Sequence, residues 1–140
     1  MSVKDFVQQR RDTLIAMRRD FHMYPEPAWL EYRSAAKVAD TLISLGYDVA
    51  LGADVLDLDS RMGLPSDEVM KAAMDRAIKE GANPELVEKM GYGKTAIVAT
   101  MKFGGEGPVV AFRVDMDSND VIEAKEDSHV PTKKGFRSCH

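Results

Sequence analysis

Two runs of mostly apolar residues constrain the fold of this chain more than any other feature of its sequence. Residues 95–101 and 109–114 carry apolar side chains at both odd and even positions, and successive side chains of a strand point to opposite faces of a sheet. Strands with this pattern are typical of the middle of a sheet that is covered on both faces. We therefore predict two central strands, joined by a hairpin at residues 104–108, in a sheet larger than this chain supplies.

Helical spacing of apolar residues dominates the rest of the chain, and capping residues, prolines and glycines delimit each helix. The pattern predicts a helix that begins at a capping box of Ser2 and Asp5 and ends before Tyr24, and a second helix from Trp29 or Ser34 to Leu45 with Gly46 as its cap. A strand is predicted at residues 47–51. It is followed by a helix that begins at Ser66 and ends at Gly81, and by a short helix capped by Asn83 and ended by Gly91. The predicted fold class is α/β, with helices packed on a small part of a mostly central sheet.

Composition excludes several classes of protein. A length of 140 residues suits one domain, and a net charge of −4 gives no general attraction to nucleic acid or to an anionic membrane. No apolar run approaches the ~20 residues that a membrane span needs, and the N-terminus lacks a signal-peptide core. The single cysteine, Cys139, excludes an internal disulfide and fits a reducing compartment. We expect a cytoplasmic protein with no nucleic-acid or membrane partner.

The densest polar cluster follows the second apolar run, where α/β sheets usually gather ligands and metals. One interpretation is a calcium loop, with Asp115, Asp117, Asn119 and Glu126 at positions 1, 3, 5 and 12. However, Asp120 occupies the position that needs glycine, and the preceding segment is strand-like rather than helical. The calcium loop therefore remains one alternative interpretation, although the sequence does not predict the helix that should precede such a loop.

Three other interpretations of the cluster are open. Asp115 and Asp117 have the spacing of an aspartyl nucleophile for phosphoryl transfer, but no phosphate cradle accompanies them. A carboxylate at a strand end is also typical of a metal hydrolase, in which it orients the metal ligands. Finally, the cluster is explained by an acid-rich turn that pairs with Arg113.

Several segments together resemble the zinc-dependent amidohydrolases, a family that includes aminoacylases, carboxypeptidases and indole-acetyl-amino-acid hydrolases. The family's opening motif resembles Arg18–His22 with Pro25, Glu26 and Glu31, and its strand and acidic loop resemble Pro108–Asp117. Further segments are similar to the branch that cleaves p-aminobenzoyl-glutamate: Leu45–Tyr47, Ala50–Gly52, Asp59–Pro65, Ile97–Thr100 and the late residues Ser128, His129, Pro131, Gly135, Phe136, Ser138 and Cys139. The resemblance spans nearly the whole chain.

The resemblance implies a catalytic domain in which a pair of zinc or manganese ions activates water. The bond cleaved is the amide of a small N-acyl amino acid, here the one that joins p-aminobenzoate to glutamate. A second subunit or a homo-oligomer is the implied assembly. Residues 1–140 correspond to an incomplete N-terminal part of the domain, and the metal-binding segment is expected after His140. We therefore expect this chain alone to hold no metal and to be inactive, and the alternative is a small calcium-binding or protein-interaction module that uses Asp115–Glu126.

The resemblance also assigns roles to two candidate catalytic residues. Asp117 matches the family acid that orients a metal ligand. Asp115 matches a position that is a metal-binding histidine in related peptidases, whereas in this branch it is expected to pair with Arg113 or to cap backbone donors. Ser118 and Asn119 replace an alanine–leucine pair of the family, a change expected to loosen the loop.

Other reactive side chains are expected to have ordinary roles. We interpret His22 as a packing or capping residue and His129 as a solvated loop residue. Neither His140 nor Cys139 is expected to be a metal ligand. Arg61 is either a substrate contact or a partner in an ion pair of its loop.

Overall fold

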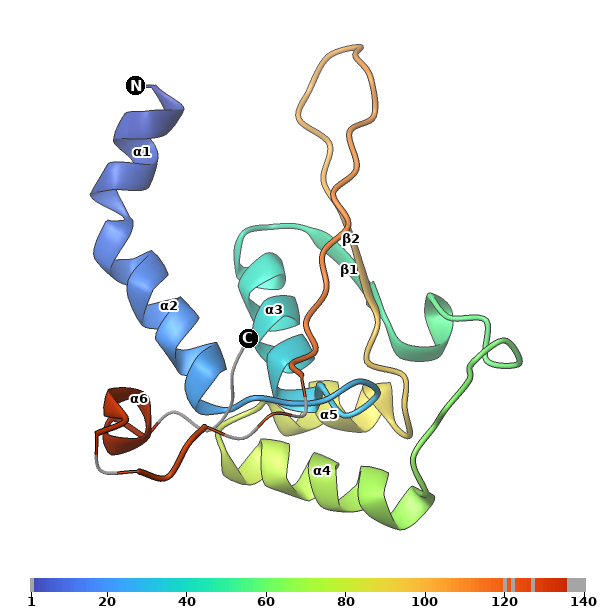
Figure 1. The fold of residues 1–140 in the computed structure, drawn as a ribbon. Coiled ribbons are helices and arrows are strands. Elements are labelled where there is room, and N and C mark those ends of the chain that lie inside the picture. The colour runs from blue at the N-terminus through green and yellow to red at the C-terminus, as the bar shows by residue number, and fades with distance from the viewer. Residues whose placement is uncertain (1, 120, 122, 127, 136–140) are drawn as a thin grey trace. The chain divides into compact units, whose positions relative to one another are not determined.

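The computed structural model describes residues 2–119, 121, 123–126 and 128–135, which form two compact units. One unit is Glu26–Asp117, and the other combines Met1–Pro25 with Ser118–His140. Figure 1 shows the chain coloured from its N-terminus to its C-terminus. The larger unit contains the sheet and the predicted catalytic acids.

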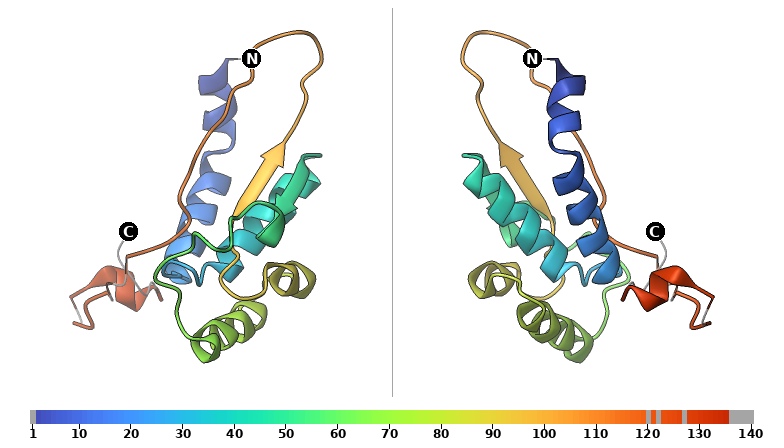
Figure 2. Two further views of the ribbon diagram at one scale, coloured as in Figure 1. Left: turned by 90° about the vertical axis from the view of Figure 1, so that its right-hand side faces the viewer. Right: turned by 90° about the vertical axis from the view of Figure 1, so that its left-hand side faces the viewer.

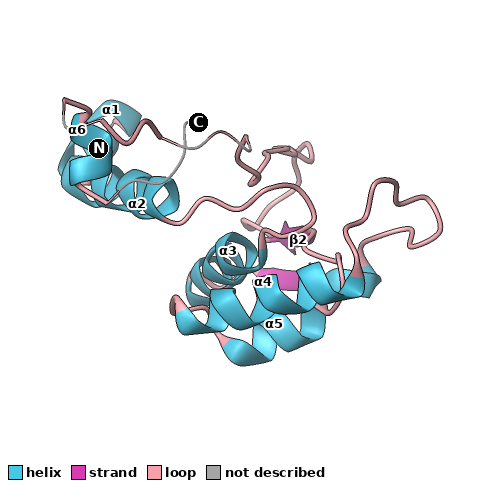
Figure 3. Ribbon diagram, turned by 60° about the horizontal axis from the view of Figure 1, so that its bottom comes forward, coloured by secondary structure: helices cyan, strands magenta, loops and turns pink. Residues whose placement is uncertain are grey.

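The unit Glu26–Asp117 consists of three α-helices, a single 3₁₀ turn and a two-stranded antiparallel sheet. In chain order its elements are α3 (Tyr32–Ser44), β1 (Asp48–Leu51), η1 (Gly52–Asp54), α4 (Asp67–Lys79), α5 (Pro84–Met90) and β2 (Ile97–Thr100). Asp48 pairs with Thr100 and Leu51 pairs with Ile97. Figure 3 shows α3, α4 and α5 grouped beside the two strands, which confirms the predicted α/β class in a part of such a domain.

The core of this unit is built around α3. Its buried alanines allow neighbouring helix backbones to approach closely, and α3 contacts α4, α5 and both strands. The buried hydrophobic cluster consists of Tyr32, Ala35, Ala36, Ala39, Leu51, Ala73, Ala77, Ala82, Val87 and Met90. One face of the sheet is therefore covered by helices of the same unit.

Local capping signals fix the helix ends as predicted. The Ser66 side chain accepts a hydrogen bond from the Val69 N–H, and the Asn83 side chain accepts one from the Glu85 N–H. Gly46 and Gly81 take φ values of +85° and +94° directly beyond α3 and α4, where a left-handed residue ends a helix. The ends of these helices are thus determined by residues close to them in the sequence.

The predicted strand at 109–114 and its hairpin with β2 are wrong for the described chain. Residues 102–103 and 107–119 have no regular secondary structure, and β2 pairs with β1 instead. The apolar side chains of the segment lie in solvent, with Val109 98% and Phe112 89% exposed. A strand that is apolar on both faces gains little from a single exposed hairpin, because it needs covering layers on both faces.

The second unit contains α1 (Val3–Gln9), α2 (Arg11–Met23) and α6 (Val130–Lys133). The capping box of Ser2 and Asp5 is present, with hydrogen bonds in both directions. The single helix predicted for this region is interrupted at Arg10, whose N–H bonds to Val7 only three residues back. None of the side chains of residues 3–23, all of which are described, is fully buried, so packing does not hold this turn in α-geometry.

Among the residues that the structure describes, no helix is long and apolar enough to cross a bilayer.

Candidate functional site

The acidic segment after residue 114 begins with an ion pair. Arg113 donates through both terminal nitrogens to the Asp115 carboxylate, at 3.0 Å from Nη1 to Oδ2 and 2.8 Å from Nη2 to Oδ1. Such a two-point contact is the strongest geometry for an arginine and a carboxylate. The pairing of Asp115 with Arg113 predicted from the sequence is therefore present, and Asp115 is 61% exposed.

Asp117 lies near a second carboxylate, that of Glu31. The Thr95 hydroxyl at the start of the β2 segment donates to Glu31 Oε2 at 2.8 Å. Burial raises the pKa of Glu31 above its ordinary value, and the negative charge of Asp117 raises it further. Hydrogen bonds from nearby backbone N–H groups and from Thr95 act in the opposite direction. A half-buried acid that holds its proton more tightly is thus influenced by the charge of an exposed one.

Glu26 organises the segment that carries Glu31. Its carboxylate is 1% exposed and accepts hydrogen bonds from the N–H groups of Arg33 at 2.9 Å and Ser34 at 2.7 Å. These are donors of the first turn of α3, which have no partner within the helix. Burial raises the pKa of Glu26, whereas these hydrogen bonds and the charge of Arg76 lower it. Glu26 therefore acts as a helix cap supplied from a preceding loop.

A strained turn between the two glutamates holds a neighbouring loop. Trp29 has a φ of +67°, and it is the one non-glycine residue with positive φ among those the structure describes. Its indole Nε1 donates to the Met62 carbonyl at 3.0 Å. A residue kept in a left-handed conformation indicates that its surroundings determine its position, and here the long loop between η1 and α4 is the surrounding element.

Arg61 fastens the same loop to the turn after α5. Its Nη1 donates to the carbonyls of Tyr92 at 3.0 Å and Gly93 at 3.2 Å, and its Nε donates to Leu58. The Tyr32 hydroxyl in turn accepts from the Gly93 N–H at 2.9 Å. The guanidinium thus holds two loops together through backbone carbonyls, a role that neither interpretation from the sequence included.

The other unit contains a cluster of one carboxylate and two histidines. Glu123 is 6% exposed and accepts from His22 Nε2 at 2.9 Å, and its second oxygen contacts His129 Nε2. The hydrogen bond from His129 is the main cause that holds the pKa of Glu123 below its ordinary value, with His22 contributing in the same direction. His22 thus has the structural role predicted for it, whereas His129 is paired rather than simply solvated.

The structure bears on the metal sites that the sequence predicts. Within the residues that the structure describes, no group of three or more histidine, cysteine, aspartate or glutamate side chains is arranged to hold a metal ion. Cys139 and His140 lie outside the described residues. The segment before Asp115 is not helical, so the proposed calcium loop lacks the entering helix that its geometry requires.

The sequence indicates some of these residues and gives no sign of others. Asp115, Asp117 and Glu31 were visible in motifs, but the approach of Glu31 to Asp117 joins positions far apart in the chain. Glu123 and Thr95 carried no signal, because an isolated glutamate or threonine is ordinary in any loop.

The chain is similar in sequence to part of several bacterial hydrolases. No family model matches it. One subunit of the p-aminobenzoyl-glutamate hydrolase of Escherichia coli (strain K12) is 44% identical over 139 residues, which cover 99% of this chain and 32% of that protein. Indole-3-acetyl-aspartic acid hydrolase of Enterobacter agglomerans is 42% identical over 138 residues, which cover 99% of this chain and 32% of that protein. The chain therefore spans about a third of the length of the curated relatives it matches.

The fold of the chain is also similar to that of a protein of known structure. The crystal structure of the aminobenzoyl-glutamate utilization protein from Klebsiella pneumoniae superposes with a TM-score of 0.82 at 45% identity, covering 86% of this chain and 30% of that chain. In sequence and fold the chain is thus a homologue of part of these proteins, two of which are named as hydrolases, as the resemblance predicted. In particular, it is homologous to the p-aminobenzoyl-glutamate hydrolase of Escherichia coli over about one third of the matching polypeptide.

Proposed function

We propose that this chain forms the N-terminal part of an enzyme that hydrolyses the amide bond of an N-acyl amino acid. The substrate is p-aminobenzoyl-glutamate, and the products are p-aminobenzoate and glutamate. The observation that supports this most is 44% identity, over 99% of the chain, to a hydrolase named for that substrate. Two relatives are named for substrates in which an acyl group with an aromatic ring is joined to an acidic amino acid. The proposal therefore extends to other substrates of this class.

The acids of the larger unit have supporting roles in this proposal. Asp117 orients a metal ligand supplied by the rest of the enzyme, and Asp115, paired with Arg113, fixes the segment that carries it. Burial raises the pKa of Glu31, and the charge of Asp117 adds to that rise, so the charges of the two carboxylates influence each other. A divalent ion, zinc or manganese, completes the enzyme, and the described part of this chain provides no group that fits it.

The assembly is part of the same proposal. One relative is named as one of the subunits of a hydrolase. We infer that the full-length form of this protein works with a second subunit or as a homo-oligomer.

The test uses this chain alone and a continuous polypeptide that joins it to the remainder of the Escherichia coli relative. Release of p-aminobenzoate is measured by chromatography with added zinc or manganese. We expect no turnover by the 140-residue chain and clear turnover by the joined polypeptide, alone or together with the second subunit of that hydrolase. Turnover by the short chain, or none by the joined polypeptide in both conditions with any N-acyl amino acid of this class, would contradict the proposal.

The role of Asp117 is tested in the joined polypeptide. Asp117→Asn is expected to lower the turnover number by roughly 10- to 100-fold, the usual effect of removing a residue that orients a metal ligand. The matched control is Asp12→Asn, the same change at a carboxylate that is 94% exposed on α2. Equal activities of the two variants would show that Asp117 has no such role.

A further inference from the structure

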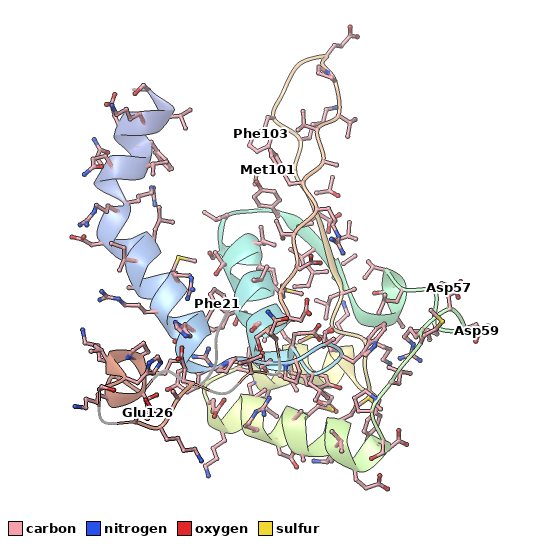
Figure 4. The ribbon with its side chains drawn as sticks, viewed as in Figure 1. Phe21, Asp57, Asp59, Met101, Phe103 and Glu126 are labelled. Atoms are coloured by element: carbon pink, nitrogen blue, oxygen red, sulfur yellow. The ribbon has the colours of Figure 1, made fainter. Side chains whose placement is uncertain are left out.

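The pairing of the two strands brings the loop after β1 and the turn before β2 to the same end of the sheet. The last residue of β1, Leu51, is paired with the first residue of β2, Ile97. Figure 2 shows β2 leading away from this end. Figure 4 shows Phe103 on the limb beyond β2, away from Asp57 and Asp59 of the loop. The loop and the turn can therefore contribute side chains to one site.

The segment that carries Glu31 is attached to the same end of the sheet. Thr95, which precedes β2, donates a hydrogen bond to Glu31, the acid whose pKa is raised by burial and by the charge of Asp117. Trp29 precedes Glu31 in this segment and is bonded to the loop after β1 through the Met62 carbonyl. The indole therefore belongs to the same group of contacts as the candidate acids.

The indole of Trp29 is held in a defined orientation. Its one donor, Nε1, is used at the edge of the ring, at 3.0 Å from the Met62 carbonyl, so the faces of the ring are left for apolar contacts. The Trp29 backbone has a φ of +67°, a strained conformation of a kind that clusters at ligand-binding sites. Arg61 already attaches the same loop to the carbonyls of Tyr92 and Gly93. Attachment of the loop alone therefore gives no reason for the strain at Trp29.

The chemistry of this place favours an aromatic ligand. The face or edge of an indole packs well against a second aromatic ring, and Met62 offers a thioether, which also makes favourable contacts with aromatic rings. The substrate proposed above has one aromatic ring, and that ring is bonded to the carbonyl carbon of the amide to be cleaved. A residue that binds the ring must therefore lie close to the groups that act on the amide, and Trp29 is tied to the segment that carries Glu31.

We propose that Trp29 is a specificity-determining residue that binds the aromatic ring of the acyl group of the substrate. One face of the indole packs on the ring, and the hydrogen bond to Met62 keeps the indole in place. The proposal rests on the proposed function for the identity of the substrate. It differs from a purely structural role, in which Trp29 only fastens the loop.

The experiment compares two substrates of the joined polypeptide that share the amino acid and differ in the acyl group. p-Aminobenzoyl-glutamate carries the ring, and acetyl-glutamate does not. Trp29→Leu is expected to lower the ratio of the two kcat/KM values by roughly 3- to 10-fold, the size of one aromatic contact. An unchanged ratio, with both values lowered equally, would show that Trp29 only fastens the loop and would overturn the proposal.

Two further variants show whether the effect belongs to the ring of Trp29. Trp29→Phe keeps an aromatic face but lacks the Nε1 donor, and it is expected to retain part of the preference for p-aminobenzoyl-glutamate. Phe103→Leu replaces an aromatic residue on the limb beyond β2, and it is expected to leave the ratio unchanged. Circular dichroism checks that the variants retain their helices. A loss of preference in Phe103→Leu as large as that in Trp29→Leu would contradict the proposal.

Equilibrium binding separates this proposal from the proposed function. Binding of p-aminobenzoate to the joined polypeptide is measured by calorimetric titration and does not require catalysis. An inactive polypeptide whose dissociation constant for p-aminobenzoate rises in Trp29→Leu would contradict the proposed function and leave the role of Trp29 intact. An active polypeptide with the same dissociation constant in both forms would do the reverse. Absence of both binding and hydrolysis would contradict both proposals.

Discussion

A single buried carboxylate determines how the segment that bears the candidate acids begins. Glu26 reaches the N–H groups of Arg33 and Ser34 from a loop and replaces the usual side-chain cap of α3, since the Glu31 side chain makes no cap hydrogen bond. The exchange of solvent for two short hydrogen bonds offsets the cost of burying the carboxylate. The position of Glu31 therefore depends on a residue that precedes it in the loop.

Replacement of Glu26 tests this role. Glu26→Ala is expected to lower the free energy of unfolding by about 2 kcal/mol or more, because it leaves buried N–H groups without an acceptor. Asp5→Ala removes half of an exposed capping box, and the expected loss is about 0.5–1 kcal/mol. Urea denaturation measures both values. A smaller loss for Glu26→Ala than for Asp5→Ala would show that the loop cap is not important.

The turn after α5 contains a glycine at which an added side chain would have to displace the end of the Leu64 side chain. Gly93 has a φ of +59°, and a Cβ atom there would lie 2.6 Å from Leu64 Cδ2. Gly93→Ala is expected to cost roughly 2 kcal/mol or more in thermal unfolding, the sum of backbone strain and overpacking. Gly63→Ala shares the positive φ, at +71°, but meets no atom within 4 Å, so only about 1 kcal/mol is expected. Similar losses would argue against the close packing.

At the scale of elements, the sequence determines helix ends more directly than strand pairing. Ser66, Asn83 and Gly46 act on backbone groups within a few residues, so their effects can be read without the fold. The choice of β1 as the partner of β2 depends on contacts between segments far apart in the chain and has no comparable local signal. The run 109–114 has strand composition, yet composition does not supply the neighbouring strands that would make it one.

The candidate site shows the same division. The pairing of Arg113 with Asp115 joins residues close together in the chain and was predictable. The approach of Glu31 to Asp117, and of His22 to Glu123, joins segments that only the fold brings together. Their side-chain types gave no indication of these contacts.

The acidic segment also permits a prediction about calcium. Its first acid is already paired with Arg113, and no helix precedes it, so the chain is expected to show no calcium binding in the micromolar range by calorimetric titration. The titration is repeated with Asp115→Asn and Glu126→Gln. Micromolar binding that these changes abolish would restore the calcium-module alternative.

At the scale of the whole molecule, the chain consists of two units. In the unit that combines Met1–Pro25 with Ser118–His140, the carboxylate of Glu123 connects segments that are far apart in the sequence. Glu123 connects the end of α2 to the residue that precedes α6. Because its pKa is lower in the folded chain, its stabilising effect is complete above the ordinary value of 4.5. The effect is lost as the pH falls through the lower value in the folded chain.

Hydrogen exchange measures this effect. Glu123→Gln is expected to reduce the protection of amides in α6 at neutral pH, because the uncharged amide forms weaker hydrogen bonds with the histidines. The difference from the unchanged protein should disappear in acid, below the lowered pKa of Glu123. Glu126→Gln, a change at an exposed glutamate nearby, serves as the control. Unchanged protection in Glu123→Gln would show that this connection does not hold α6.

The strained turn at Trp29 has a practical consequence. This is the single tryptophan of the chain, and its indole nitrogen is bonded to the loop that Arg61 also fastens. Ultraviolet emission excited at the indole band therefore originates from one defined place. Its wavelength and lifetime report whether that loop is attached or released, so the molecule carries a built-in optical sensor of the region next to its candidate acids.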